Sequence, residues 1–343
     1  MKRRTFLGSG LGVTTVAAVP AVAQDSLSFS LVTDRAAAAT TLAARMAAMS
    51  DGRIIFEVKA AGTEAAPGFL DSVASGEADL FLTSQDAFVA RNPAFGLFSS
   101  MPGGMSASEL ESWIMVADGR MMWDALGEEF GIKSFSAGDD GAMPLWSREP
   151  INGLADLSSG PVGSTGLGLQ LLNELGIGDV VDVMSGLDFK NLVAFDGFTP
   201  SQMAASGLLS SFPHMTTPNA GRPSATLGVG INLSRWTALP EADQFLIERC
   251  IMAEHGTQRA LALHNNVLAL NENASVIIEH ETAQDVWDAQ IAGANAILSK
   301  MFDAGDLAAD AADAYLYFIN DVAGWSAIGE TAYFLGRKEA LSQ

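Results

Sequence analysis

Cysteine, histidine and positive charge are all scarce in this sequence. The single cysteine, Cys250, excludes an internal disulfide, and its apolar surroundings are typical of a buried residue. The four histidines, His214, His255, His264 and His280, lack the spacing of metal ligands. The common zinc, nucleophile and phosphate-loop motifs do not occur either. The sequence therefore gives no support to an enzyme, and it predicts neither a metal nor a cofactor.

Lysine and arginine number 19 against 40 aspartates and glutamates, which leaves a net charge of −21. Such a surface repels phosphate backbones, so we expect no nucleic-acid partner. Beyond the N-terminal residues, no segment has the length and apolarity of a membrane-spanning helix. Because a bound anion would need a local positive group, the few arginines are candidate site residues.

The first residues have the pattern of an export signal. Residues 2–7, Lys-Arg-Arg-Thr-Phe-Leu, resemble a bacterial twin-arginine signal, and a short, weakly apolar stretch follows them. Ala21-Val22-Ala23 then matches a small-x-small cleavage site. We expect residues 1–23 to be removed and the mature chain to lie in the periplasm.

The mature chain is predicted to be an α/β protein. Strands at 27–32, 53–59 and 78–82 alternate with helices at 36–49 and 68–75, an order that favours a parallel sheet. The stretch 212–224 contains three prolines and is predicted to be a loop. Helical patterns dominate the sequence after residue 233.

The length of the mature chain suits two lobes better than one core. We assign residues 24–147 and 232–284 to lobe I and residues 148–231 to lobe II, because a Pro/Asn/Gly stretch after Ser147 is typical of a crossing. Residues 285–343 are predicted to form C-terminal helices packing across the lobes.

Polar residues follow the predicted strands, where open α/β sheets bind ligands. The first strand ends at Asp34 and Arg35, the second at residues 61–63, and the third at Thr83 and Ser84. These side chains are predicted to form one wall of a pocket, with ordinary polar loops as the alternative interpretation.

Five short stretches in a fixed order resemble the periplasmic substrate-binding subunits of TRAP transporters, the DctP-type family. They are S-D-G-R within 50–62, S-G-E-A-D within 70–84, N-P-A-F at 92–95, I-N-G-L-A-D-L within 151–160, and N-L-S-R-W-T-A-L-P within 231–240. The resemblance implies a two-lobe periplasmic-binding-protein fold, α/β with mostly parallel sheets and long helices bridging the lobes. It also implies capture of a small organic ligand, in this family mostly a carboxylate, for delivery to TRAP membrane permease subunits.

Two features of the family pattern are missing. The family's carboxylate-binding arginine corresponds to Gly163, and no lysine or arginine lies between Arg148 and Lys190. The chain therefore resembles a branch without that arginine, whose loss would forfeit about 1.5–3 kcal/mol of charge-assisted contact. A keto-acid-binding branch also holds a metal, and the matching positions here are Ala142 and Arg222, so no metal is expected.

Arg222 and Arg35 are the two candidate anchors for an anionic ligand. Arg222 lies in a Pro/Gly-rich stretch, where a solvated arginine is the alternative interpretation. If Arg222 is the anchor, Arg222→Ala should weaken binding at least tenfold and leave the melting temperature nearly unchanged.

A neutral or weakly acidic ligand is a second possibility. Asp34 and Asp196 would then accept hydrogen bonds from its hydroxyl or amino groups, whereas Asp139 and Asp140 fit turn and cap chemistry better. Core packing is the favoured interpretation of Trp146, Phe195 and Phe198, and an apolar floor of the pocket is the alternative for each.

The leading interpretation is a solute-binding protein of a TRAP-type transporter, and not an enzyme. The alternatives are a periplasmic enzyme exported folded with a cofactor, and a binding-protein relative that acts as a sensor module. The C-terminal helices also suggest a homodimer, as in some family members, although solvated helices are equally consistent with their composition.

Overall fold

The computed structural model describes residues 26–186, 189–217 and 221–341 of the chain. The predicted export signal at residues 1–23 lies outside the described residues. The strands are β1 (Leu27–Thr33), β2 (Ile54–Ala60), β3 (Leu80–Ser84), β4 (Ile132–Asp139), β5 (Leu145–Ser147), β6 (Val162–Ser164), β7 (Val180–Asp182), β8 (Ala194–Phe195), β9 (His214–Thr217), β10 (Thr226–Asn232) and β11 (Ile278–Glu281).

Helices make up most of the remaining structure. The α-helices are α1 (Ala36–Met49), α2 (Phe69–Ala74), α3 (Ala107–Val116), α4 (Gly119–Glu129), α5 (Leu167–Glu174), α6 (Pro200–Ser206), α7 (Leu233–Thr237), α8 (Glu241–Glu272), α9 (Gln284–Ala304), α10 (Leu307–Ser326) and α11 (Ala332–Leu341). The shorter helical turns are η1 (Thr63–Gly68), η2 (Gln85–Phe88), η3 (Pro93–Phe98), η4 (Leu154–Ser158), η5 (Val183–Ser185), η6 (Phe189–Asn191) and η7 (Ala327–Thr331). No helix in these described ranges is long and apolar enough to cross a membrane.

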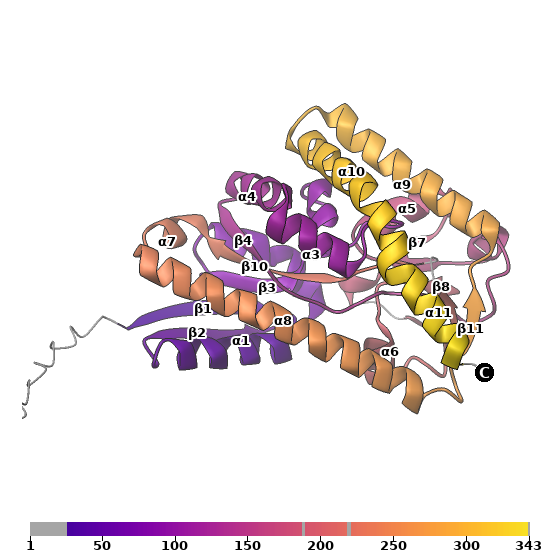
Figure 1. Ribbon diagram of the computed structural model, residues 1–343, viewed down its shortest axis with the longest axis horizontal. Coiled ribbons are helices and arrows are strands. Elements are labelled where there is room, and N and C mark those ends of the chain that lie inside the picture. Colours follow the sequence, from indigo (N-terminus) through magenta and orange to yellow (C-terminus); the bar gives the residue numbers. More distant parts are fainter. Residues whose placement is uncertain (1–25, 187–188, 218–220, 342–343) are drawn as a thin grey trace, which may run out of the picture.

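Two sheets form the frame of the molecule (Figure 1). The first has the strand order β2-β1-β3-β10-β4, and the second has the order β11-β9-β5-β8-β6-β7. One strand in each sheet runs against its neighbours, β10 in the first and β5 in the second. Each of these is the strand that the chain enters directly after crossing from the other sheet. The predicted two-lobe α/β class with mostly parallel sheets is confirmed.

The sheets divide the chain at other points than the sequence suggested. β5 already belongs to the second sheet, so the chain leaves the first sheet after Asp139. β10 belongs to the first sheet, so the return precedes Thr226. The Pro/Asn/Gly stretch after Ser147 is therefore a turn within the second half. Strand membership thus differs from the predicted boundaries at 147/148 and 231/232. β11, in the segment 232–284 that was assigned to lobe I, also belongs to the second sheet, and two separately moving lobes stay a prediction.

The first sheet follows from its local sequence. Phe29 and Leu31 alternate with polar residues in β1 and are buried, and α1 packs Leu42 and Met46 against the same core. α1 has the predicted bounds because Asp51 and Gly52, both at positive φ, end it. In contrast, the predicted loop at 212–224 contains β9, a strand of four residues.

Long helices connect the two halves. α8 packs against α1 and β4 of the first half and against α6 of the second (Figure 1). α9 packs against α5, α10 packs against α3 and α4, and α9 and α10 pack against each other. One buried apolar core accordingly includes Trp113 from the first half, Leu171 from the second and Ile297 from α9.

Asp139, the last residue of β4, fixes the junction where the chain crosses between the sheets. Its carboxylate accepts hydrogen bonds from the Gly141 backbone N–H at 2.7 Å and from the Thr226 hydroxyl at 3.0 Å. Burial raises the pKa of this carboxyl to about 6, from an ordinary value of 3.8.

This raised pKa predicts a pH-dependent contribution to stability. The folded chain binds the proton more tightly, so the contribution is full below pH 3.8 and is lost as the pH rises through 6. A shift of about two units corresponds to about 3 kcal/mol. We therefore expect the unfolding free energy of Asp139→Asn, measured in urea, to gain up to about 3 kcal/mol relative to the wild type between pH 4 and pH 7. A difference that does not change with pH would contradict this account.

Candidate ligand-binding site

A cavity of about 370 Å³ lies between the ends of the two sheets. Arg35, Asp86 and Asp140 follow β1, β3 and β4 of the first sheet, and Thr165 and Phe198 follow β6 and β8 of the second. The cavity is also lined by Thr63, Ser84, Met143, Val183, Met184, Gly197, Gln202, Ala205, Ser206 and Ala225. Its volume is typical of small-molecule sites, and carboxyl ends of strands are where such sheets bind ligands.

Arg222 lies directly behind this lining, where groups from both halves hold it. One of its guanidinium nitrogens donates to Asp86, another donates to the Thr165 hydroxyl at 2.5 Å, and Nε lies 3.3 Å from Asp196 Oδ2. Thr165 also donates to Asp86 at 2.8 Å, and Ser164 donates to Asp196. We call Asp86, Ser164, Thr165, Asp196 and Arg222 the Arg222 network.

The Arg222 side chain is fully buried. Its backbone pairs with Met143, the residue opposite it on the other crossing segment, through hydrogen bonds of 2.8 and 2.9 Å. A solvated loop arginine, one of the two interpretations of the sequence, is therefore wrong. Two carboxylates already neutralise this guanidinium, which leaves it poorly placed to bind a third. Burial raises the pKa of Asp196, and the neighbouring Arg222 opposes that shift.

Arg35 is the arginine that lines the cavity itself. Its Nη1 lies 3.1 Å from Asp34 Oδ2, its Nε lies 3.6 Å from Asp140 Oδ2, and a quarter of the side chain is exposed. The Thr33 hydroxyl accepts a hydrogen bond from the Arg35 backbone N–H at 2.8 Å and donates to the Leu82 carbonyl at 2.6 Å. Carboxylates on two sides therefore orient a guanidinium that has five N–H donors.

The nine predicted site residues fall into three groups. Arg35, Ser84 and Phe198 line the cavity. Asp34, Trp146, Asp196 and Arg222 lie behind it and contact residues close to the ligand space; Trp146, for example, is buried and donates its indole N–H to the Phe198 carbonyl at 2.9 Å. Thr83 and Gly163 are not among the cavity-lining residues.

Gly163 faces the interior of the second half. A Cβ placed on it would lie 2.6 Å from Val183, 3.0 Å from Leu192 and 3.0 Å from Phe195. A long cationic side chain at this position would enter an apolar core and not the cavity. The role of Gly163 as the counterpart of a carboxylate-binding arginine stays a prediction.

Sequence reasoning missed Asp86 and Thr165 and assigned Asp140 to turn chemistry. All three occupy the same kind of position as Arg35, immediately beyond the carboxyl end of a strand. β6 has only three residues, so no local pattern indicated where Thr165 would lie. Asp86 lies a few residues after the predicted third strand. The strand-end rule that identified Ser84 therefore applies to Asp86 as well.

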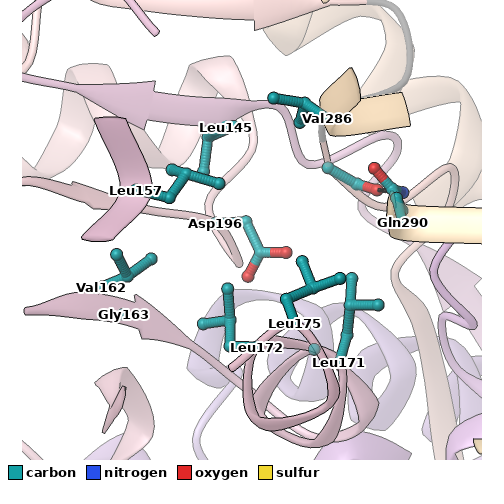
Figure 2. Close-up of a pocket in the computed structure, with 12 residues that line it drawn as sticks. Leu145, Leu157, Val162, Gly163, Leu171, Leu172, Leu175, Asp196, Val286 and Gln290 are labelled. Atoms are coloured by element: carbon teal, nitrogen blue, oxygen red, sulfur yellow. Dashed lines mark hydrogen bonds between the residues drawn. The ribbon is translucent and has the colours of Figure 1, made fainter. Parts of the chain in front are cut away.

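A second cavity of about 40 Å³ is lined by Asp196, by other residues of the second half and by Val286 and Gln290 of α9 (Figure 2). Figure 2 shows the Asp196 carboxylate between the leucines of α5 and the β6 strand. The walls are mostly apolar: Leu145, Leu157, Val162, Leu171, Leu172, Leu175 and Val286. This volume has room for little more than a water molecule, so it is not an organic-ligand site.

No protein-family model matches the chain. A curated relative, the monocarboxylate 2-oxoacid-binding periplasmic protein of Nostoc sp., is 28% identical over 243 residues, which cover 69% of this chain and 65% of that protein. This chain thus spans slightly less than two thirds of the relative's length.

Two solved structures are similar over nearly their whole length. One is a TRAP transporter solute-binding protein from Bordetella bronchiseptica, described as a dimer with calcium and picolinate, at TM-score 0.85, 20% identity, and coverage of 93% of this chain and 99% of that one. The other is a TRAP periplasmic solute-binding protein from Colwellia psychrerythraea with calcium and pyruvate, at TM-score 0.84, 20% identity, and coverage of 91% and 100%.

The chain therefore has the two-lobe fold of the periplasmic solute-binding proteins of TRAP transporters. Together with the curated relative, this confirms the family resemblance found in the sequence. The similar proteins are solute-binding proteins and not enzymes.

The residues present do not fit the calcium seen in the similar structures. Within the described ranges, no three histidine, cysteine or acidic side chains gather in a way that could hold a metal ion. Between Asp86 and Asp196 lies the guanidinium of Arg222, which already supplies a positive charge to both carboxylates. A resident divalent cation would have to compete with this buried arginine.

The Arg222 network predicts a large loss of stability on substitution, in contrast to the small effect that the sequence suggested. Arg222→Gln would leave two buried carboxylates without their partner, which typically costs about 3–5 kcal/mol. We expect a fall of about 3 kcal/mol or more in the free energy of unfolding in urea. Arg91→Gln, which breaks the exposed pair with Asp71, is the control and should lose less than about 1 kcal/mol. Equal losses in the two variants would contradict the buried network.

Proposed function

We propose that this chain is a periplasmic solute-binding protein of a TRAP-type transporter, which captures a small organic acid and delivers it to membrane permease subunits. The cavity lining carries the proposal, because the strand ends of both sheets contribute to it. A ligand bound there contacts both halves, so it binds the closed arrangement better and shifts the population toward it. The relatives support a small carboxylate as the ligand class, since they bind 2-oxoacids, pyruvate or picolinate.

Within this function, Arg35 is the anchor of the ligand carboxylate. Arg222 is occupied by Asp86 and Asp196, whereas Arg35 lines the cavity and is partly exposed to it. A guanidinium and a carboxylate form paired, charge-assisted hydrogen bonds, which contribute both affinity and orientation. Arg35 thus takes the role of the arginine that is absent between Arg148 and Lys190.

Substitution of Arg35 tests the anchor. Native mass spectrometry of gently purified protein would first identify a retained organic acid, and calorimetry would then measure its affinity. We expect Arg35→Gln to weaken binding at least tenfold, about 1.4 kcal/mol, because the paired contact is lost. Arg91→Gln serves as the control and should bind as the wild type does. Unchanged affinity in Arg35→Gln would reject the anchor, and a chain that retains and binds no organic acid would reject the function.

We also propose that the chain forms a homodimer through its C-terminal helices. Trp325, Ile328 and Leu335 are 68%, 72% and 63% exposed in a helical segment where large side chains would normally pack. A second uncovered apolar surface is a groove of about 610 Å³ along α8, lined in part by Leu263 and Val267. A two-fold related copy can cover both surfaces at once.

Sedimentation of the mature chain tests this assembly. We expect the wild type to sediment as a dimer and the double variant Trp325→Lys/Ile328→Lys as a monomer, because the lysines place charge in the apolar contact. Val116→Lys, at another exposed apolar position, should remain a dimer. A monomeric wild type, or a double variant that still dimerises, would contradict the proposed dimer.

A further inference from the structure

The charges around the cavity do not balance. Two guanidinium groups and four carboxylates form one cluster there: Arg35 and Arg222 with Asp34, Asp86, Asp140 and Asp196. When all are ionised, the cluster carries a net charge of −2. A bound monoanion would make it −3 in a largely enclosed space, where repulsion is weakly screened. A ligand that brings a positive group as well as a carboxylate avoids this cost.

The hydrogen-bonding capacity of the lining shows the same excess of acceptors. Asp86 accepts from Thr165 and Arg222 through Oδ2, and its Oδ1 is buried beside Gly166 without accessible surface, so Asp86 contributes negative charge but no acceptor that a ligand can reach. Asp140 accepts from the Gln202 amide at 3.1 Å. An ionised carboxylate can only accept hydrogen bonds, so the ligand must supply the donors. A 2-oxo acid has no N–H or O–H once ionised, whereas an ammonium group has three N–H donors.

Part of the lining is apolar. Val183, Met184, Phe198 and Ala205, all from the second half, form a wall together with Met143 from the crossing segment. These five side chains carry no charge, and a surface of this kind favours a hydrocarbon substituent. The cavity thus combines one cationic anchor, Arg35, one accessible acidic acceptor, Asp140, and an apolar surface.

We propose that the cavity binds a small zwitterion, an amino acid with an apolar side chain. Its carboxylate pairs with Arg35, and its ammonium group donates to Asp140, whose side chain is partly exposed. This proposal rests on the proposed function, because it places the ligand in the same cavity and on the same arginine. In support, burial raises the pKa of Asp140, and an adjacent ammonium would stabilise the ionised form of that carboxylate.

Ligands that share one carbon skeleton distinguish a zwitterionic ligand from a 2-oxo acid and from an amine. The protein would be freed of retained ligand by unfolding and refolding, and calorimetry would compare each amino acid with the 2-oxo acid and the amine of the same skeleton. Suitable series start from alanine, valine, leucine and phenylalanine. We expect the amino acid of at least one series to bind at least ten times more tightly than both of its matched compounds.

Two outcomes would overturn the proposal in different ways. If 2-oxo acids bind as tightly as the amino acids in every series and depend on Arg35, the zwitterion is wrong while the proposed function stands. If no compound binds and the gently purified protein retains no organic acid, the zwitterion proposal and the proposed function are both wrong.

A substitution at Asp140 tests the role of the carboxylate directly. Asp140→Asn should weaken binding of the amino acid at least ten times more than it weakens binding of the matched 2-oxo acid, because only the amino acid loses an ammonium contact. Asp71→Asn, at an exposed aspartate outside the cavity, should change neither affinity. An equal loss for both ligand types in Asp140→Asn would mean that Asp140 only supports the fold.

Discussion

The structure depends on one guanidinium group that lies between two carboxylates at the junction of its halves. Arg222 contacts Asp86 from the first half and Asp196 from the second, and Thr165 connects two of these groups. None of the three ionised groups is stable alone in such a buried position, because desolvation of each requires a partner. The three charged groups therefore stabilise one another. Their contacts also position the strand ends that form the cavity.

A single cation can both neutralise buried carboxylates and bind a ligand, and these two roles are separate here. Arg222 neutralises buried carboxylates and joins the halves, which leaves Arg35 as the cation available to a ligand. The two similar structures hold bound calcium as well as an organic ligand, whereas here the guanidinium supplies the positive charge between the carboxylates. In the proposed function, a ligand then enters an acidic cavity in which Arg35 is the anchor, and this balance of charge selects the small molecules that bind.

Local patterns in the sequence predicted the first half well. The alternation in β1 and β2 and the Asp51-Gly52 stop after α1 depend only on neighbouring residues, and the rule for strand ends identified Arg35 and Ser84. The second half was harder because its strands have two to four residues, too short for a periodic pattern. The role of Arg222 was out of reach, since its partner Asp86 is 136 positions away in the sequence.

The most direct measurement is a crystal structure of the protein with the ligand that it retains on purification. The account predicts an organic carboxylate paired with Arg35 in the cavity between the sheets, with Arg222 still bound to Asp86 and Asp196. A ligand carboxylate bound to Arg222, or a metal ion in place of the Arg222 contacts, would contradict it.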